Sequence, residues 1–248
     1  MAHQDDEYGI FSQIEAELQA GKWVRCVYAT HGGAAVICDQ RERESRDVLH
    51  RLGVVTNDIL FIGRQLSISD GQLYRHVRVW SDWLACFLNS DDRVEACYLP
   101  AWEGGHPDHD VLHAATLLLL TARKSPPTIY QYPLYNNWNC LGPFFRVLSP
   151  LPYNGQVVAR AIDWRSRFRY LWFCLSYHSQ WRSWIGLFPF VAVHYLFRGD
   201  QYLQFANLNR IMELPHQRPL YYEIRRFLDW SVMRMTITQL KNNIPYIQ

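Results

Sequence analysis

The first two-thirds of the chain alternate between short strand-like and longer helix-like stretches, and this alternation limits the folds available. Apolar residues in 8–20 recur at helical spacing, whereas 23–30 is rich in β-forming residues and runs into Gly32-Gly33. The same patterns predict further helices over 41–52, 80–88 and 110–124 and further strands over 58–62, 94–99 and 128–132. Strands that alternate with helices pair in parallel through right-handed crossovers. We therefore expect an α/β fold with a Rossmann-like, mostly parallel sheet and helices on both of its faces.

The last third is aromatic-rich, and its spacing predicts helices over 160–180 and 219–241. We find no linker, repeat or low-complexity tract, so we expect a single domain over 1–248. It would have a sheet-forming core over about 1–135 and a helical part over about 136–248. Its tryptophans and tyrosines are explained by core packing, or by a platform for a sugar or a lipid-linked or glycopeptide acceptor.

Composition excludes some classes of function. A formal net charge of +2 offers no electrostatic basis for binding nucleic acid. The six cysteines form no C-x-x-C pair and the N-terminus has no secretory signal, which favours reduced thiols and a cytoplasmic location. The apolar runs 114–122 and 185–197 are shorter than the roughly 20 residues of a membrane-spanning helix. Peripheral contact of the second run with a membrane stays open.

Two short segments, 2–7 (Ala-His-Gln-Asp-Asp-Glu) and 105–110 (Gly-His-Pro-Asp-His-Asp), concentrate metal-capable side chains. Catalytic zinc takes three protein ligands, usually histidine and carboxylate, and keeps one position open. Taken singly, the first segment also fits a solvated tail or adventitious chelation at a free amino terminus, and the second fits a capped helix start. His109 and His113, four residues apart on one helical face, are an alternative metal pair.

Taken together, the two segments resemble the motifs of the LmbE-like, or PIG-L, superfamily of zinc-dependent N-acetylglucosaminyl deacetylases. Four further pieces follow in that family's order and extend the resemblance over about residues 1–180. They are Thr30-His31-Gly32, Arg41-x-x-Glu44 with Leu52-Gly53-Val54, Ser69-Asp70-Gly71, and Tyr177-x-Ser179-Gln180.

The resemblance implies a metal site at residues from both segments. His3, Asp6 and His109 would ligate Zn2+, and Asp5 would be the general base for the water that attacks the amide. Both segments would then converge on one cation.

The resemblance also implies roles for three residues that do not bind the metal. His106 would stabilise the oxyanion or protonate the leaving amine, and Asp108 would orient His106 and keep it cationic. Arg41 would bind a sugar hydroxyl or a phosphate of the substrate; the alternative is a solvated arginine on the helix surface.

The chain departs from the family pattern at two places. Gln4 stands where proline is usual, which predicts a looser loop. Only Met1 and Ala2 precede His3, so the first strand is expected to be truncated and its position in the sheet vacant. Either the native chain begins upstream of Met1, which we favour, or the metal loop is poorly anchored.

The expected function is metal-dependent hydrolysis of an N-acetyl group on an N-acetylglucosamine conjugate. The aglycone, whether inositol, lipid, polysaccharide unit or antibiotic scaffold, is not indicated. Two alternatives stay open: a zinc amidase that acts on a non-sugar acyl amide, and a catalytically impaired relative that binds sugar. The formation of homo-oligomers also stays open.

Overall fold

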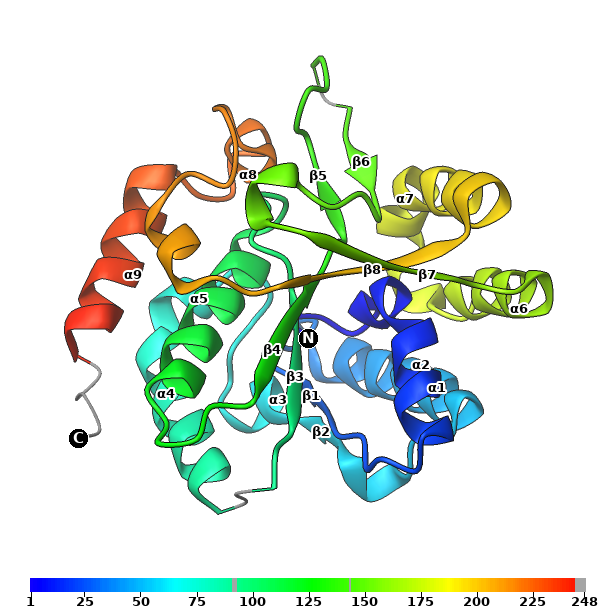
Figure 1. Cartoon of the computed structure of the whole chain (residues 1–248), viewed down its shortest axis with the longest axis horizontal. Coiled ribbons are helices and arrows are strands. Elements are labelled where there is room, and N and C mark those ends of the chain that lie inside the picture. Colours follow the sequence, from blue (N-terminus) through cyan, green and yellow to red (C-terminus); the bar gives the residue numbers. More distant parts are fainter. Residues whose placement is uncertain (91–92, 143, 244–248) are drawn as a thin grey trace. The chain divides into compact units, whose positions relative to one another are not determined.

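The computed structural model describes residues 1–90, 93–142 and 144–243 and confirms a mixed α/β fold that contains parallel strand pairs (Figure 1). Its residues group into two compact units. Unit 1 is Met1–Asp70 with Ala159–Tyr202, and unit 2 is Gly71–Val158 with Leu203–Gln248. That all 248 residues form a single domain stays a prediction.

Unit 1 holds the first parallel pair of strands. β1 pairs in parallel with β2, with Cys26 opposite Ile59 and Tyr28 opposite Phe61. The elements of this unit are η1 (Asp6–Gly9), α1 (Phe11–Gln19), β1 (Cys26–Tyr28), α2 (Ala35–Leu52), η2 (Thr56–Asp58), β2 (Ile59–Phe61), α3 (Ile62–Gln65), α6 (Trp164–Cys174), η4 (His178–Gln180), α7 (Trp181–Val193) and the π-helix η5 (His194–Arg198).

The residues before His3 form backbone hydrogen bonds with β1 and the residues that follow it. The Met1 ammonium donates to the Val27 carbonyl at 2.9 Å, and the Ala29 and Thr30 amides donate to the carbonyls of Met1 and Ala2 at 3.1 and 3.0 Å. The position beside β1 that was expected to be vacant is therefore occupied by Met1 and Ala2, which form no assigned strand. These hydrogen bonds anchor the segment that carries His3.

The aromatic C-terminal part supplies much of the core of unit 1. Phe11 of α1 packs against Tyr170 and Phe173 of α6, with ring centroids 5.4 and 5.7 Å apart. Trp184 of α7 stacks on Tyr177 at 5.8 Å and is buried. Core packing therefore accounts for the aromatic residues on the inner faces of both helices.

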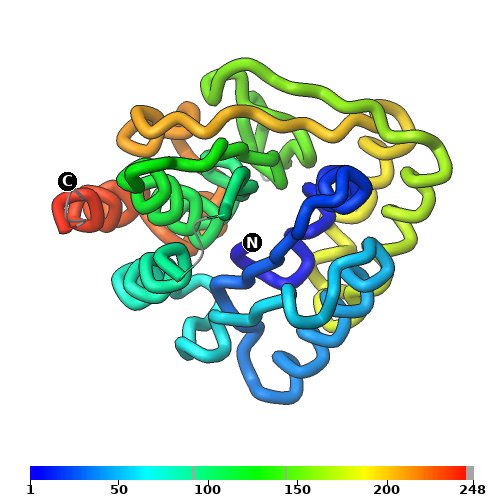
Figure 2. The backbone as a smooth tube through the Cα atoms, turned by 60° about the horizontal axis from the view of Figure 1, so that its bottom comes forward, coloured from blue at the N-terminus to red at the C-terminus, as the bar shows by residue number. Residues whose placement is uncertain are grey.

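Unit 2 holds the second parallel pair, β3 with β4, in register from Ala96 opposite Thr128 to Pro100 opposite Tyr132. β8 joins β4 antiparallel, and the sheet order is β3-β4-β8-β7. α4, α5 and α9 pack against one another (Figure 2). The elements are α4 (Leu73–Asn89), β3 (Ala96–Pro100), α5 (Pro107–Thr121), β4 (Thr128–Tyr132), β5 (Tyr135–Asn136), β6 (Arg146–Val147), η3 (Pro152–Asn154), η6 (Leu208–Met212), α8 (Tyr221–Ile224) and α9 (Trp230–Asn243), with β7 (Val157–Ala161) and β8 (Asp200–Phe205) running across the sequence boundaries of the units.

Several predicted boundaries were wrong. α2 begins at Ala35 rather than at 41, and α4 begins at Leu73 rather than at 80. The helix predicted over 160–180 is in fact the end of β7 followed by α6 and η4, and β8 was not predicted. Among the described residues, no helix has the length and apolar character needed to cross a membrane.

Candidate active site

The segment 2–7 forms a tight buried turn around Asp6. Asp6 Oδ2 accepts hydrogen bonds from the backbone amides of Ala2 and His3, both at 2.8 Å. Its other oxygen, Oδ1, lies 3.8 Å from His3 Nδ1. Two donor atoms that bind one tetrahedral zinc ion at 2.0–2.2 Å lie about 3.4 Å apart. The spacing of His3 and Asp6 is within a few tenths of an ångström of this value, and their chemistry suits a shared zinc ion.

Asp5 is held in a strained conformation beside this pair. Its φ is 126°, a left-handed value that residues other than glycine rarely adopt. Its backbone amide donates to Glu7 Oε2 at 2.7 Å, and Glu7 also accepts from the Tyr28 hydroxyl. The fully buried Glu7 thereby fixes the backbone that aims Asp5. No role was predicted for Glu7, although its place in Asp-Asp-Glu was a signal.

The pKa of the Asp5 carboxyl is raised well above its ordinary value. Burial is the largest cause and the neighbouring Asp6 carboxylate adds to it, whereas His3 and Arg41 act in the opposite direction. A cation bound to His3 and Asp6 would also lower this pKa, because it favours the charged carboxylate.

Gln4 anchors the turn at 2–7 through hydrogen bonds instead of loosening it. Its side-chain amide donates to the Thr30 carbonyl at 3.1 Å, and its own carbonyl accepts from the side chain of Gln180. The preceding Ser179 donates from its backbone and its hydroxyl to Glu44, at 2.9 and 2.5 Å. The loosening predicted from the missing proline is therefore offset, and two distant motifs meet inside unit 1 to support the turn.

The Arg41 side chain is held in place by an ion pair with Asp70. Its guanidinium donates to Asp70 Oδ2 at 2.6 Å, while Asp70 Oδ1 lies 2.8 Å from the Thr30 hydroxyl. The arginine crosses Gly32 so closely that a Cβ there would meet its Cδ at 2.4 Å. Arg41 is therefore a fixed side chain of unit 1 and not a solvated helix-surface arginine.

In unit 2, the loop after β3 leads into α5, and buried carboxylates hold it. Asp110 accepts hydrogen bonds from the backbone amides of Glu103 and Gly104 at 3.2–3.3 Å. Burial raises the pKa of Asp110 well above its ordinary value. Glu103 in turn accepts from the amides of Leu134 and Tyr135 at 2.7 and 2.9 Å. The segment that carries His106 is therefore rigidly placed.

His106 caps the N-terminus of α5. Its Nδ1 accepts a hydrogen bond from the Asp108 backbone amide at 3.2 Å, which leaves the ring proton on Nε2 when the imidazole is neutral. The Asp108 carboxylate lies 3.9 Å from the same Nδ1, but its oxygens accept from the amides of Gly71 and Leu73 at 2.5 and 3.0 Å. Asp108 thus orients His106 through its backbone as well.

His109 lies one turn along α5 and is buried. Its ring centroid is 5.3 Å from that of His106 and 5.7 Å from that of Tyr135. His113, the other member of the alternative metal pair, is engaged elsewhere: its Nδ1 lies 2.8 Å from the Pro100 carbonyl. Burial lowers the pKa of His113 to about 4, so it is a neutral core histidine at pH 7.

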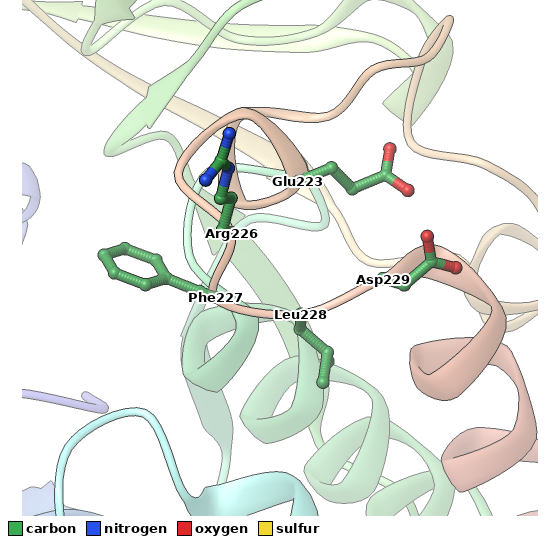
Figure 3. Close-up of a pocket in the computed structure, with 5 residues that line it drawn as sticks. All are labelled: Glu223, Arg226, Phe227, Leu228 and Asp229. Atoms are coloured by element: carbon green, nitrogen blue, oxygen red, sulfur yellow. The ribbon is translucent and has the colours of Figure 1, made fainter.

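Phe227 was not anticipated from the sequence. It is about half exposed, and its ring centroid lies 5.5 Å from that of His106. It borders a surface pocket of about 390 Å³ between α8 and α9, and Figure 3 shows its ring projecting away from Glu223 and Asp229. No signal in the sequence marks it, because it sits in a stretch predicted as continuous helix.

The structure therefore brings the predicted site residues together in two groups. Unit 1 gathers His3, Asp5, Asp6 and Arg41, and unit 2 gathers His106, Asp108 and His109.

Comparisons with known structures support the fold. A deacetylase triple mutant of the teicoplanin biosynthetic pathway matches with a TM-score of 0.60 and 18% identity, over 83% of this chain and 94% of that one. The A40926 pseudoaglycone deacetylase Dbv21 matches with 0.55 and 17%, over 83% and 94%. The zinc-inhibited form of teicoplanin deacetylase Orf2 matches with 0.56 and 16%, over 83% and 96%.

The sequence comparisons place the similarity at the N-terminal side. No curated protein matches the chain in sequence. The model of the PIG-L family, described as GlcNAc-PI de-N-acetylase, matches residues 1–120, which include both metal-capable segments. The resemblance to the PIG-L family predicted from the motifs is therefore confirmed over residues 1–120.

Proposed function

We propose that the chain is a metal-dependent hydrolase that removes the N-acetyl group from an N-acetylglucosamine conjugate. The observation that carries the proposal is the turn at 2–7. It holds a histidine and a carboxylate at a spacing suited to zinc, beside a second carboxylate aimed by a buried glutamate. This turn lies in the segment that matches the GlcNAc-PI de-N-acetylase family.

His3, Asp6 and His109 would hold the metal. A zinc ion in such a site lowers the pKa of a water molecule to about 7 and polarises the amide carbonyl. The ring of His109 is oriented by its contacts with His106 and Tyr135. These contacts suit a metal ligand, because its ring must keep a fixed orientation.

Asp5 would accept the proton of the water that attacks the acetamide carbonyl. His106, whose Nδ1 accepts from the Asp108 amide, would donate a hydrogen bond from Nε2 to the developing oxyanion. When the C–N bond breaks, the proton held by Asp5 passes to the leaving amine, so acetate and a free amine are released.

The substrate would be an N-acetylated amino sugar joined to a larger group. Arg41, fixed by Asp70, would bind a hydroxyl or phosphate, and Phe227 would stack against the apolar face of the sugar. Solved structures with the same fold include a deacetylase–teicoplanin complex, so a glycopeptide is one aglycone to test. A cytoplasmic location stays a prediction, consistent with six free cysteines.

The test measures acetate release and zinc content of the full chain with N-acetylglucosamine conjugates and N-acyl amino acids. Asp5→Ala should keep one zinc per chain and lose about 100-fold or more of its turnover, because only the base is removed. His109→Ala should lose the zinc itself. His50→Ala, at an exposed histidine of α2, is the matched control and should keep both.

Three outcomes would contradict the proposal. Near-full activity of Asp5→Ala would refute the assignment of the base. Acetate release from acyl amino acids but not from sugar conjugates would favour an amidase. A well-folded chain that binds no metal would leave only a sugar-binding relative without turnover.

A further inference from the structure

The outer face of α6 is apolar, although it is exposed and lies outside the core. The inner face of the helix is buried and includes Tyr170 and Phe173. The outer face carries an aromatic stripe in which Trp172 is 64% exposed. Its members recur at intervals of four, four and three residues, which puts them on one side of the helix. They are Trp164, Phe168, Trp172 and Leu175.

A second apolar stripe runs along α7 and η5. Trp184, Leu187 and Val191 are buried on the inner side. The outer side is exposed, with Ile185 at 66% and Phe197 at 80%. Its members are Trp181, Ile185, Val193 and Phe197, at intervals that are multiples of four. Because α6 contacts both α7 and η5, we treat the two stripes together and name them the α6–α7 face.

The charge around the α6–α7 face is positive. The segment Ala159–Tyr202 contains six arginines and two aspartates. Arg165, Arg182 and Arg198 are exposed along the two stripes. The acidic groups are engaged locally, because Asp163 caps α6 through the Ser166 amide at 3.1 Å and Asp200 accepts from the Tyr202 hydroxyl at 3.1 Å.

Exposed tryptophan, phenylalanine and isoleucine next to arginine are the composition of helices that lie in the interface of a bilayer. The aromatic and aliphatic side chains enter the boundary between headgroups and acyl chains, while arginine meets anionic headgroups. Exposed apolar patches mark interaction sites. The excess of arginine favours a partner of negative charge and selects a lipid surface over a second copy of this chain, whose own face would repel it.

We propose that the α6–α7 face docks the protein on an anionic lipid bilayer. The stripes supply the apolar contact and the three arginines supply the attraction to the headgroups. Docking of this kind needs no membrane-spanning segment, and it is independent of the hydrolytic chemistry proposed above.

The test is sedimentation of the full chain with vesicles of phosphatidylcholine, alone or mixed with phosphatidylserine. The wild type should bind the mixed vesicles, bind the neutral ones less, and lose affinity as salt is raised. Trp172→Ser with Ile185→Ser should weaken binding by about 100-fold, because two large apolar side chains no longer enter the bilayer. Arg165→Gln with Arg182→Gln should weaken it by about tenfold and remove most of the salt dependence.

The controls are exposed residues of unit 1 outside the face. Val55→Ser matches the apolar pair and Arg51→Gln matches the basic pair, and both should bind like the wild type. Near-ultraviolet circular dichroism checks that each variant is folded. Failure of the wild type to bind mixed vesicles at low salt would overturn the proposal, as would equal binding by the apolar double variant. A dimer that this variant dissociates, without vesicle binding, would assign the face to a second copy.

Discussion

Individual buried carboxylates hold both motif segments in place. In unit 1, Asp6 accepts from two backbone amides and Glu7 accepts from a third. In unit 2, Asp108 and Asp110 do the same for other amides. A carboxylate that accepts several amide hydrogen bonds has few alternative positions, so the loops are preorganised.

Asp70 is expected to act as a positioning residue through Arg41. Asp70→Asn removes the charge that holds the guanidinium, so KM should rise about tenfold while kcat and zinc content change little. Steady-state kinetics and metal analysis check this. Asp39→Asn, which breaks the exposed pair with Arg64, is the control. A fall in kcat at unchanged KM would exclude a role for Arg41 in binding substrate.

His113 predicts a pH dependence of stability. Its pKa is about 4 in the folded protein and 6.5 in the unfolded chain, so the unfolded state takes up the proton first as the pH falls. The contribution of the neutral ring is complete above pH 6.5 and is lost as the pH falls toward 4. Between pH 7 and 5 this loss is about 2 kcal/mol.

Urea unfolding of the wild type and His113→Gln at both pH values measures this contribution. The gap between their free energies of unfolding should shrink by about 2 kcal/mol at pH 5. Leu117→Met, on the same helix and without a titratable group, should give a gap that does not change with pH. A constant gap for His113→Gln would show that the ring is not held neutral.

At the scale of elements, the sequence predicted those parts whose local signals agree with their tertiary environment. β4 has the predicted bounds, and α5 lies close to the predicted helix. The earlier starts of α2 and α4 were not predicted, because Ala34 and Gln72 provide no side-chain cap that could mark a helix start. β7 is exposed along its whole length, so no alternation of apolar and polar residues marked it.

The candidate site shows the same division between local and distant signals. The residues of the two short motifs were predicted because their spacing is local. The support from Gln180 to Gln4, 176 positions away, and the contact between Phe227 and His106 depend on the tertiary fold. Such contacts leave no trace in a single sequence.

Asp108 connects two helices of unit 2, so its removal should lower the stability of the protein. Its carboxylate binds the Gly71 and Leu73 amides at the start of α4, although the residue itself belongs to the first turn of α5. Asp108→Ala removes this acceptor from the buried Leu73 amide and from the partly buried Gly71 amide. We expect a loss of about 3 kcal/mol in the free energy of unfolding, measured with urea.

The exposed variant Asp39→Ala is the control for this measurement and should stay within about 0.5 kcal/mol of the wild type. A loss of activity in Asp108→Ala at unchanged stability would mean that the carboxylate acts mainly on His106. A loss of both activity and stability would be expected if Asp108 orients His106 and also holds the start of α4.

At the scale of the whole molecule, the proposed metal site requires ligands from residues that lie in different units, because His3 and Asp6 belong to unit 1 and His109 to unit 2. Metal binding would then be linked to the folding of both units. A ligand that binds only the native state stabilises it by an amount that grows with its concentration relative to Kd.

We therefore expect zinc to raise the free energy of unfolding of the metal-free chain by about 4 kcal/mol at a thousandfold excess over Kd. If one ion takes ligands from both units, His3→Ala or His109→Ala alone should abolish most of this increase and reduce the stoichiometry from about one to about zero. If each unit bound its own ion, the wild type would take up about two, and each variant would keep one together with part of the stabilisation. Calorimetric titration of zinc into the metal-free wild type and both variants separates the two arrangements, because the number of ions lost on a single substitution differs between them.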